Sequence, residues 1–178
     1  IIIPCYIAQG MANFSYGNEA VANSPGTPVY EAEQQMNAKF GKSNMMIALV
    51  PPDSNITEKK MTEEIDDLSY VKYALSLSSV LPEGIPEDFL PENITSLMHS
   101  KNWARVIINV RSAGESDDAF KFSDNIRAII DKYYPNETTY LVGVTPSTQD
   151  IKDIIVPDYN RVNIVSLLGV ALVIAITY

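Results

Sequence analysis

The C-terminal end of the chain is an uncharged run, VNIVSLLGVALVIAITY, from Val162 to Tyr178. A helix that packs on one side of a soluble domain has a polar stripe, whereas the polar side chains Asn163, Ser166 and Thr177 are few and scattered here. A helix needs about 20 apolar residues to cross a bilayer. The run therefore predicts that residues 162–178 are the start of a transmembrane helix, with a buried core helix as the alternative.

The N-terminal end is uncharged as well, from Ile1 to Asn18. Residues 1–8 are almost wholly apolar, so we expect them to be the tail of a preceding transmembrane helix. Residues 9–27 follow as a linker, and its second half is rich in Asn, Gly and Pro. Residues 28–161 then form a domain between two spans, and the shortage of Lys and Arg near the junctions favours the extracytoplasmic side. Without an initiating Met or a signal peptide, the chain is expected to be a segment of a larger membrane protein.

Composition excludes several classes of function. The net charge of −9 and the pI near 4.5 argue against nucleic-acid binding, which depends on clustered Lys and Arg. The single cysteine, Cys5, excludes an internal disulfide and a cysteine-based metal site. His99 is the single histidine and is expected on an exposed loop, so zinc would have to rely on carboxylates alone. Neither a phosphate-binding loop nor a nucleophile elbow occurs. We therefore expect no enzyme, no catalytic residue, no metal and no cofactor.

The middle of the chain alternates between the periods of helices and strands. In order, the pattern predicts a helix from Pro28 to Gly41, a buried strand over Asn44–Val50, a helix containing Met61, Ile65 and Leu68, a strand over 71–78, a strand over Ala104–Arg111, a helix beginning at Ser116 and a strand over Tyr140–Val144. From the first strand onwards this order is βαββαβ. It predicts an α+β, ferredoxin-like fold, in which a four-stranded sheet carries two helices on one face. A plain open α/β sheet is the alternative.

Several side chains in these elements carry specific expectations. The helix after Pro52 is expected to turn four charged residues toward water: Glu58, Lys59, Glu63 and Glu64. The strand over 71–78 is expected to bury alternate residues: Val71, Tyr73, Leu75 and Leu77. The acidic residues Glu115, Asp117 and Asp118 lie where a helix begins, so capping and dipole roles are expected of them.

Residues 82–103 are expected to form a proline-rich insertion with one or two helical turns. Its apolar side chains are the candidates for contact with a hydrophobic cargo or a neighbouring subdomain: Leu81, Ile85, Phe89, Leu90, Leu97, Met98 and Trp103. The alternative is that these side chains simply cover the sheet.

Charged residues lie just before the uncharged C-terminal run: Asp150, Lys152, Asp153, Asp158 and Arg161. They are interpreted either as surface charges or as residues that guide the helix where the domain meets the membrane. Tyr159 and Arg161 suit the membrane–water interface. In isolation, the apolar tail is expected either to be held by detergent or to be buried in a partner chain, which would give dimers.

Short pieces of the chain resemble the MMPL-type transporters of the resistance-nodulation-division (RND) superfamily, which includes bacterial exporters of lipids and other hydrophobic molecules. The pieces are Ala8-Gln9, Phe14-Ser15-Tyr16-Gly17, Phe40-Gly41-Lys42-Ser43-Asn44, Leu49-Val50-Pro51, Asp150-Ile151-Lys152-Asp153 and Asp158 with the apolar tail. The resemblance implies an extracytoplasmic porter domain, more similar to that of the second repeat, in the plasma (inner) membrane. It implies three partners: the remainder of the transporter polypeptide, the lipid bilayer and a hydrophobic cargo. A membrane-tethered ferredoxin-like ligand-binding or sensor domain is the alternative.

Overall fold

The computed structural model describes residues 24–52, 55–81 and 89–177. Its elements are α3 (Pro28–Phe40), β1 (Asn44–Val50), α4 (Asn55–Asp66), β2 (Val71–Leu75), α5 (Leu77–Val80), α6 (Glu92–Met98), β3 (Ala104–Val110), α7 (Asp117–Tyr133), β4 (Tyr140–Gly143) and α8 (Val144–Thr177). The expectations for residues 1–8, for most of the linker and for Ile85 lie outside the described residues.

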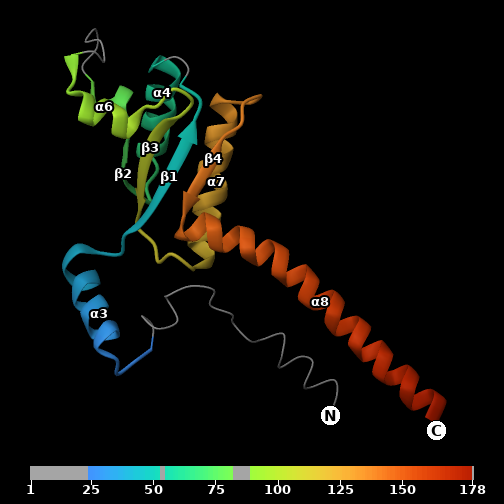
Figure 1. The fold of residues 1–178 in the computed structure, drawn as a ribbon. Coiled ribbons are helices and arrows are strands. Elements are labelled where there is room, and N and C mark those ends of the chain that lie inside the picture. Colours follow the sequence, from blue (N-terminus) through green and yellow to red (C-terminus); the bar gives the residue numbers. More distant parts are fainter. Residues whose placement is uncertain (1–23, 53–54, 82–88, 178) are drawn as a thin grey trace.

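The strands form one four-stranded sheet in the order β2-β3-β1-β4, and every neighbouring pair is antiparallel. Helices α4 and α7 lie on the same face of this sheet (Figure 1). The prediction of a mixed fold of helices with a four-stranded sheet is therefore confirmed.

The core lies between the sheet and these two helices. Met61 and Ile65 of α4 and Ile126 and Ile130 of α7 are almost fully buried against the inward side chains of the strands. The inward residues of β3 are Val106, Ile108 and Val110, as the alternation predicts. On the surface, Lys132 and Tyr133 of α7 each donate a hydrogen bond to Glu64 of α4, which also joins the two helices.

Local signals set both ends of α3 and the start of α7 near the predicted residues. Thr27 caps α3 by accepting a hydrogen bond from the Tyr30 amide, and Gly41 ends it with a φ of 72°. Ser116 caps α7 by accepting from the Ala119 amide. Helix α3 nevertheless buries none of its side chains.

The predicted burial along residues 71–78 is confirmed for Val71 and Leu77 and is wrong for Tyr73 and Leu75. A register irregularity between Val71 and Tyr73 shifts the pattern by one residue, so Val71 and Ala74 are buried while Tyr73 and Leu75 are exposed. The strand ends at Leu75, because Ser76 caps the short helix α5 and Leu77 is its first residue.

Helix α8 begins at Val144, which was expected to be the last residue of a strand, and continues without a break to Thr177. The expected boundary between residues 161 and 162 therefore lies inside one helix of 34 residues, which also contains Pro157. The helix leaves the domain at β4 and extends away from the sheet (Figure 1). Within the described residues it is the one helix long and apolar enough to cross a membrane.

Candidate functional site: an open apolar sheet face and the root of α8

The face of the sheet opposite α4 and α7 has no helix over it in the described ranges (Figure 1). We call this the open face. Its side chains come from alternate positions of the strands: Met45, Ile47, Leu49, Tyr73, Leu75, Arg105, Ile107, Asn109, Tyr140 and Val142. The expectation that Asn44–Val50 is a buried strand is therefore only half right, because Met45 on this face is exposed.

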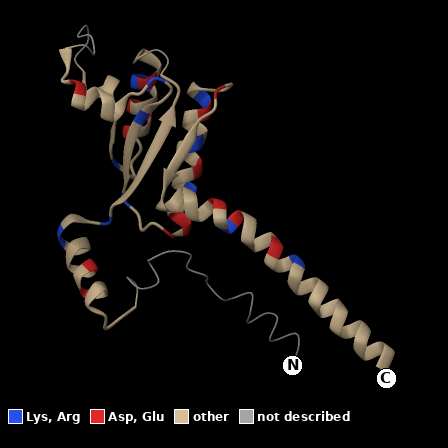
Figure 2. Cartoon of the chain, in the orientation of Figure 1, with Lys and Arg blue, Asp and Glu red and all other residues tan. Residues whose placement is uncertain are grey.

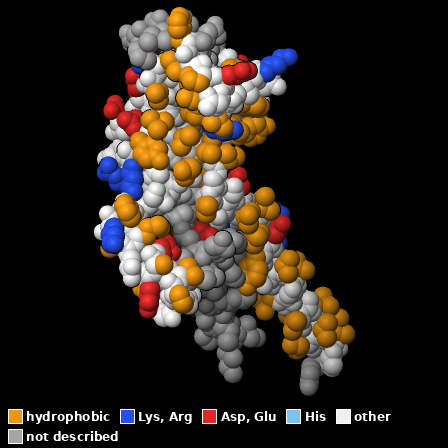
Figure 3. Space-filling view, turned by 60° about the vertical axis from the view of Figure 1, so that its left-hand side comes forward, with side chains coloured by type: hydrophobic (Ala, Val, Ile, Leu, Met, Phe, Trp, Pro, Cys, Tyr) orange, Lys and Arg blue, Asp and Glu red, His pale blue; other side chains and the backbone are white. Residues whose placement is uncertain are grey.

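One apolar row crosses all the strands of the open face. The strand register places Leu75 opposite Ile107, Ile107 opposite Ile47, and Ile47 opposite Val142. Leu75 and Val142 at its ends are exposed, and the two isoleucines are half-buried. Since neighbouring strands lie about 4.8 Å apart, the row is about 15 Å long. Figure 3 shows apolar side chains gathered over the part of the molecule that holds the sheet, and again along α8.

Polar groups flank this row on both sides. In one neighbouring row, Arg105 lies opposite Leu49 and has no ion pair within the described parts of the chain. In the other, Asn109 contacts Ser43 and Tyr73 through its amide group. Asn109 is buried and its amide is occupied, so the open face can accept an apolar molecule or surface with the cation of Arg105 at one edge.

The described residues of the insertion separate into two groups. Phe89 and Leu97 are 78% and 62% exposed, whereas four others are partly covered: Leu81, Leu90, Met98 and Trp103. The ring of Trp103 lies 5.3 Å from that of Tyr140 at an angle of 56°, so the structure joins this insertion residue to the edge of the open face. Both interpretations of the insertion, cargo contact and cover of the sheet, stay predictions.

The first turns of α8, residues 144–152, form what we call its root. The Asn44 side-chain amide donates hydrogen bonds to Thr145 at 2.6 Å and to Ser112 at 3.3 Å, and the Thr145 hydroxyl donates to the Gly114 carbonyl. Asn44, Ser112 and Thr145 are buried. A buried polar group left without a partner costs about 1–3 kcal/mol, so this network ties the root to β1 and to the loop before α7.

Charged contacts also hold the root against α7. Asp150 forms an ion pair with Arg127 at 2.9 Å. Lys152 lies 3.9 Å from the Asp117 carboxylate and 4.8 Å from the centre of the Phe120 ring. Each such exposed pair contributes less than about 1 kcal/mol, but together they fix the direction in which α8 leaves the domain.

The other predicted junction residues lie further along α8. Asp153 is exposed, and Asp158 pairs with Arg161 at 3.5 Å within the helix. Beyond Arg161 the helix carries no charge, as the colouring of Figure 2 makes visible. Asp150 and Lys152 therefore contact the domain. Asp158 and Arg161 contact each other, next to the uncharged segment of α8.

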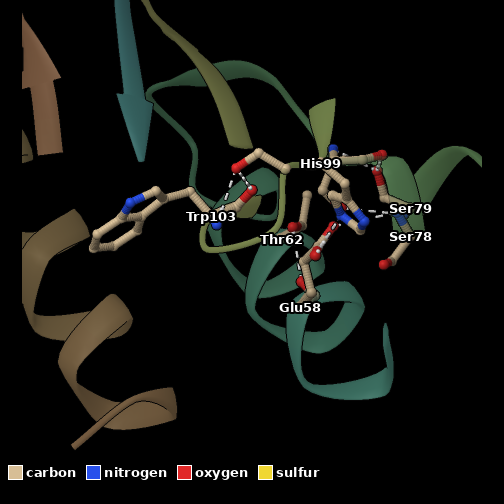
Figure 4. A network of polar contacts seen from close by, with 8 residues as sticks. Glu58, Thr62, Ser78, Ser79, His99 and Trp103 are labelled. Carbon is tan, nitrogen blue, oxygen red and sulfur yellow. Dashed lines mark hydrogen bonds and ion pairs between the residues drawn. The ribbon is translucent and has the colours of Figure 1, made fainter. Parts of the chain in front are cut away.

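A buried pair contradicts two expectations from the sequence. Glu58, expected to face water, is 3% exposed, and the side chain of His99, expected on an exposed loop, is 14% exposed. The Nε2 atom of His99 lies 2.9 Å from one Glu58 carboxylate oxygen, and the other oxygen accepts a hydrogen bond from the Ser78 amide (Figure 4). Glu58 precedes Met61 and Ile65 by one and two helical turns, so the helical spacing did contain the signal for its burial.

The pKa of Glu58 follows from opposing effects. Burial alone raises it, but the hydrogen bond and the charge of His99, together with the Ser78 hydrogen bond, lower the pKa of Glu58 below its ordinary value. Glu58 is therefore ionised at neutral pH. Within the described residues, no group of three or more acidic, histidine or cysteine side chains is arranged to hold a metal ion.

We predict that Glu58 contributes to acid sensitivity. Because its pKa is lower in the folded than in the unfolded chain, its contribution to stability is present above about pH 4.5 and is lost as the pH falls further. The free energy of unfolding should therefore fall more steeply between pH 5 and about pH 3 in the wild type than in Glu58→Gln. Urea denaturation in detergent at each pH checks this. Equal slopes for the two proteins would contradict it, and Glu63→Gln on the exposed side of α4 serves as the control.

Comparison of the chain with protein-family models and with curated proteins found no match. The resemblance to MMPL-type transporters therefore stays a hypothesis that rests on the residues quoted for it.

Proposed function

We propose that the chain is an extracytoplasmic porter domain of an RND/MMPL-type transporter that exports lipid-like or hydrophobic molecules across the plasma (inner) membrane. The observation that carries this proposal is α8, which begins at the edge strand β4 and continues into an uncharged segment with exposed apolar side chains. Apolar area costs about 25 cal/mol per Å² in water, so such a segment requires lipid or a partner.

The open face supports the choice of cargo. Its row of Leu75, Ile107, Ile47 and Val142 supplies apolar contact without requiring a specific polar group. A hydrophobic molecule can therefore move along it with little loss of hydrogen bonding. The strand order, the antiparallel neighbours and the two helices on one face further support assignment of the domain to the ferredoxin-like fold.

The root of α8 supports mechanical coupling between membrane and domain. The Asn44–Thr145 hydrogen bond and the Arg127–Asp150 ion pair connect the helix to β1 and to α7. A movement of the membrane segment would therefore turn the sheet as one body, since no flexible linker separates them.

Cysteine labelling in the intact parent protein tests this proposal. In a background without other cysteines, including Cys5→Ser, Lys101→Cys places a thiol on an exposed turn and Leu168→Cys places one in the uncharged segment. A membrane-impermeant maleimide added to whole cells should label Lys101→Cys, while Leu168→Cys should react only after detergent is added. Equal labelling of both without detergent would exclude the membrane assignment.

The membrane-tethered sensor is the second candidate, because Arg105 at the edge of an apolar row also suits an amphiphilic ligand. The coding sequence on either side of the chain separates the two. A transporter predicts several further apolar spans and a second similar domain, whereas one further span and no second domain would favour the sensor.

A further inference from the structure

Helix α6 is held to the domain in an unusual way. It buries none of its own residues, and its apolar side chains Ile94 and Leu97 are exposed. The residue that ends α6, His99, is the one whose side chain reaches the domain interior and meets Glu58 of α4. The His99–Glu58 contact is therefore one of the contacts that hold the end of α6 to the domain, beside the backbone bridge between His99 and Ala104 and the half-buried Met98.

The His99–Glu58 contact changes strength with protonation. An imidazole has an ordinary pKa of about 6.5, so the pair carries opposite charges in mildly acidic solution and is a neutral-to-charged hydrogen bond at higher pH. Opposite charges attract more strongly where water is excluded, and Glu58 is almost fully buried. The contact between the two side chains is therefore stronger when the imidazole is protonated and weaker when it is neutral.

Within the described parts of the chain, the hydrogen bonds that Thr62 and Ser78 donate to Glu58 come from neutral groups. From α4 the neighbouring side chain is the neutral Thr62, which donates to the backbone of Glu58, and α5 contributes the amide of Ser78. Strand β3 begins with Ala104, which bridges to His99. The charged residues of the segment itself, Glu92 and Lys101, are exposed to solvent.

We infer that His99 and Glu58 form a proton-sensitive latch, which fixes α6 and the following loop on the domain in mildly acidic solution and loosens them as the pH rises. The loop contains Trp103, whose ring lies against Tyr140 at the edge of the open face. The latch therefore controls the position of an aromatic side chain beside the apolar row. This inference concerns regulation and does not depend on the transport proposal.

The chain contains one histidine and one tryptophan, so each reports its own site. In the full chain in detergent, nuclear magnetic resonance of the imidazole protons follows His99, fluorescence follows Trp103, and hydrogen exchange follows the amides of α6. Between pH 5 and pH 8 all three should change with one midpoint. Exchange of the α6 amides, corrected for its intrinsic pH dependence, should accelerate about tenfold, because a hydrogen bond between charged partners is stronger than one with a neutral imidazole.

Three variants sharpen this test. Glu58→Gln should lower the imidazole midpoint, and His99→Gln should remove the Trp103 transition and hold α6 exchange at its fast level throughout. Glu63→Gln, exposed on the same helix, should behave as the wild type. Circular dichroism checks that each variant is folded. In the wild type, titration of His99 without any change in the exchange of the α6 amides would contradict the latch. Equal imidazole midpoints in the wild type and in Glu58→Gln would also contradict it.

Discussion

Replacement of Ile108 by alanine should lower the free energy of unfolding by about 3 kcal/mol, whereas the same replacement at the adjacent Ile107 should lower it by about 1 kcal/mol. Both residues lie in the central strand β3, but Ile108 is fully buried under α4 and α7, and Ile107 is half-buried on the open face. The first change leaves a cavity in the core, while the second leaves a surface that water can reach. Urea denaturation in detergent, followed by circular dichroism, measures both values.

This matched pair tests which face of the sheet is the core. Ile107→Ala should retain the fold and weaken the binding of a lipophilic fluorescent probe to the open face, because it interrupts the apolar row between Leu75 and Ile47. A larger loss of stability for Ile107→Ala than for Ile108→Ala would mean that the open face is covered by another part of the protein.

Replacement of Gly143 by alanine should destabilise the domain by about 3 kcal/mol. Gly143 joins β4 to α8 with a φ of 150°, a conformation that side chains rarely adopt. A Cβ atom there would lie 2.7 Å from the Met45 carbonyl oxygen and 3.2 Å from the Met46 Cα. Both contacts are with backbone atoms of β1, so the strand would have to shift. Denaturation measurements on the detergent-solubilised chain check the loss.

Gly169 provides the control, because it lies within α8 and a Cβ there would meet no atom within 4 Å. Gly169→Ala should change the stability by less than about 1 kcal/mol. If Gly143→Ala changed the stability as little as Gly169→Ala, this would contradict the close packing of Gly143 against the backbone of β1.

Features that depend on neighbouring residues were predictable from the sequence. The bounds of the strand over Asn44–Val50, the helix start at Pro28 and the start of a helix near Ser116 all follow from local residue types and are present as predicted. Each is set within a few residues by turn chemistry or by an apolar run ending at proline. The side-chain cap of α7 is Ser116, however, and not one of the acidic residues of which capping was expected.

Features that depend on distant residues were not predictable. The partner of Glu58 is separated from it by 41 positions, and nothing near either residue indicates the other. The irregularity in β2 arises from its pairing with β3, which a single strand does not reveal. The open face was also missed, because β1 and β3 are apolar on both sides and periodicity alone does not say which side a helix covers.

The ion-pair partners of the charged residues near the membrane run could not be predicted from the sequence either. The sequence places Asp150 and Lys152 near the membrane run, but only the packing of α8 on α7 selects Arg127 and Asp117 as their partners. Asp158 and Arg161 instead find each other one turn apart.

The unbroken course of α8 has a geometric consequence. At 1.5 Å per residue, its 34 residues make a rod about 51 Å long that is attached to the sheet at one end. If the far end of α8 stayed in place and the helix tilted by about 10°, the domain would move by about 9 Å. If the helix rotated about its own axis, the apolar row would turn with it through the angle of that rotation. The sheet could in this way be presented to different neighbours in turn, with its strands and core unchanged.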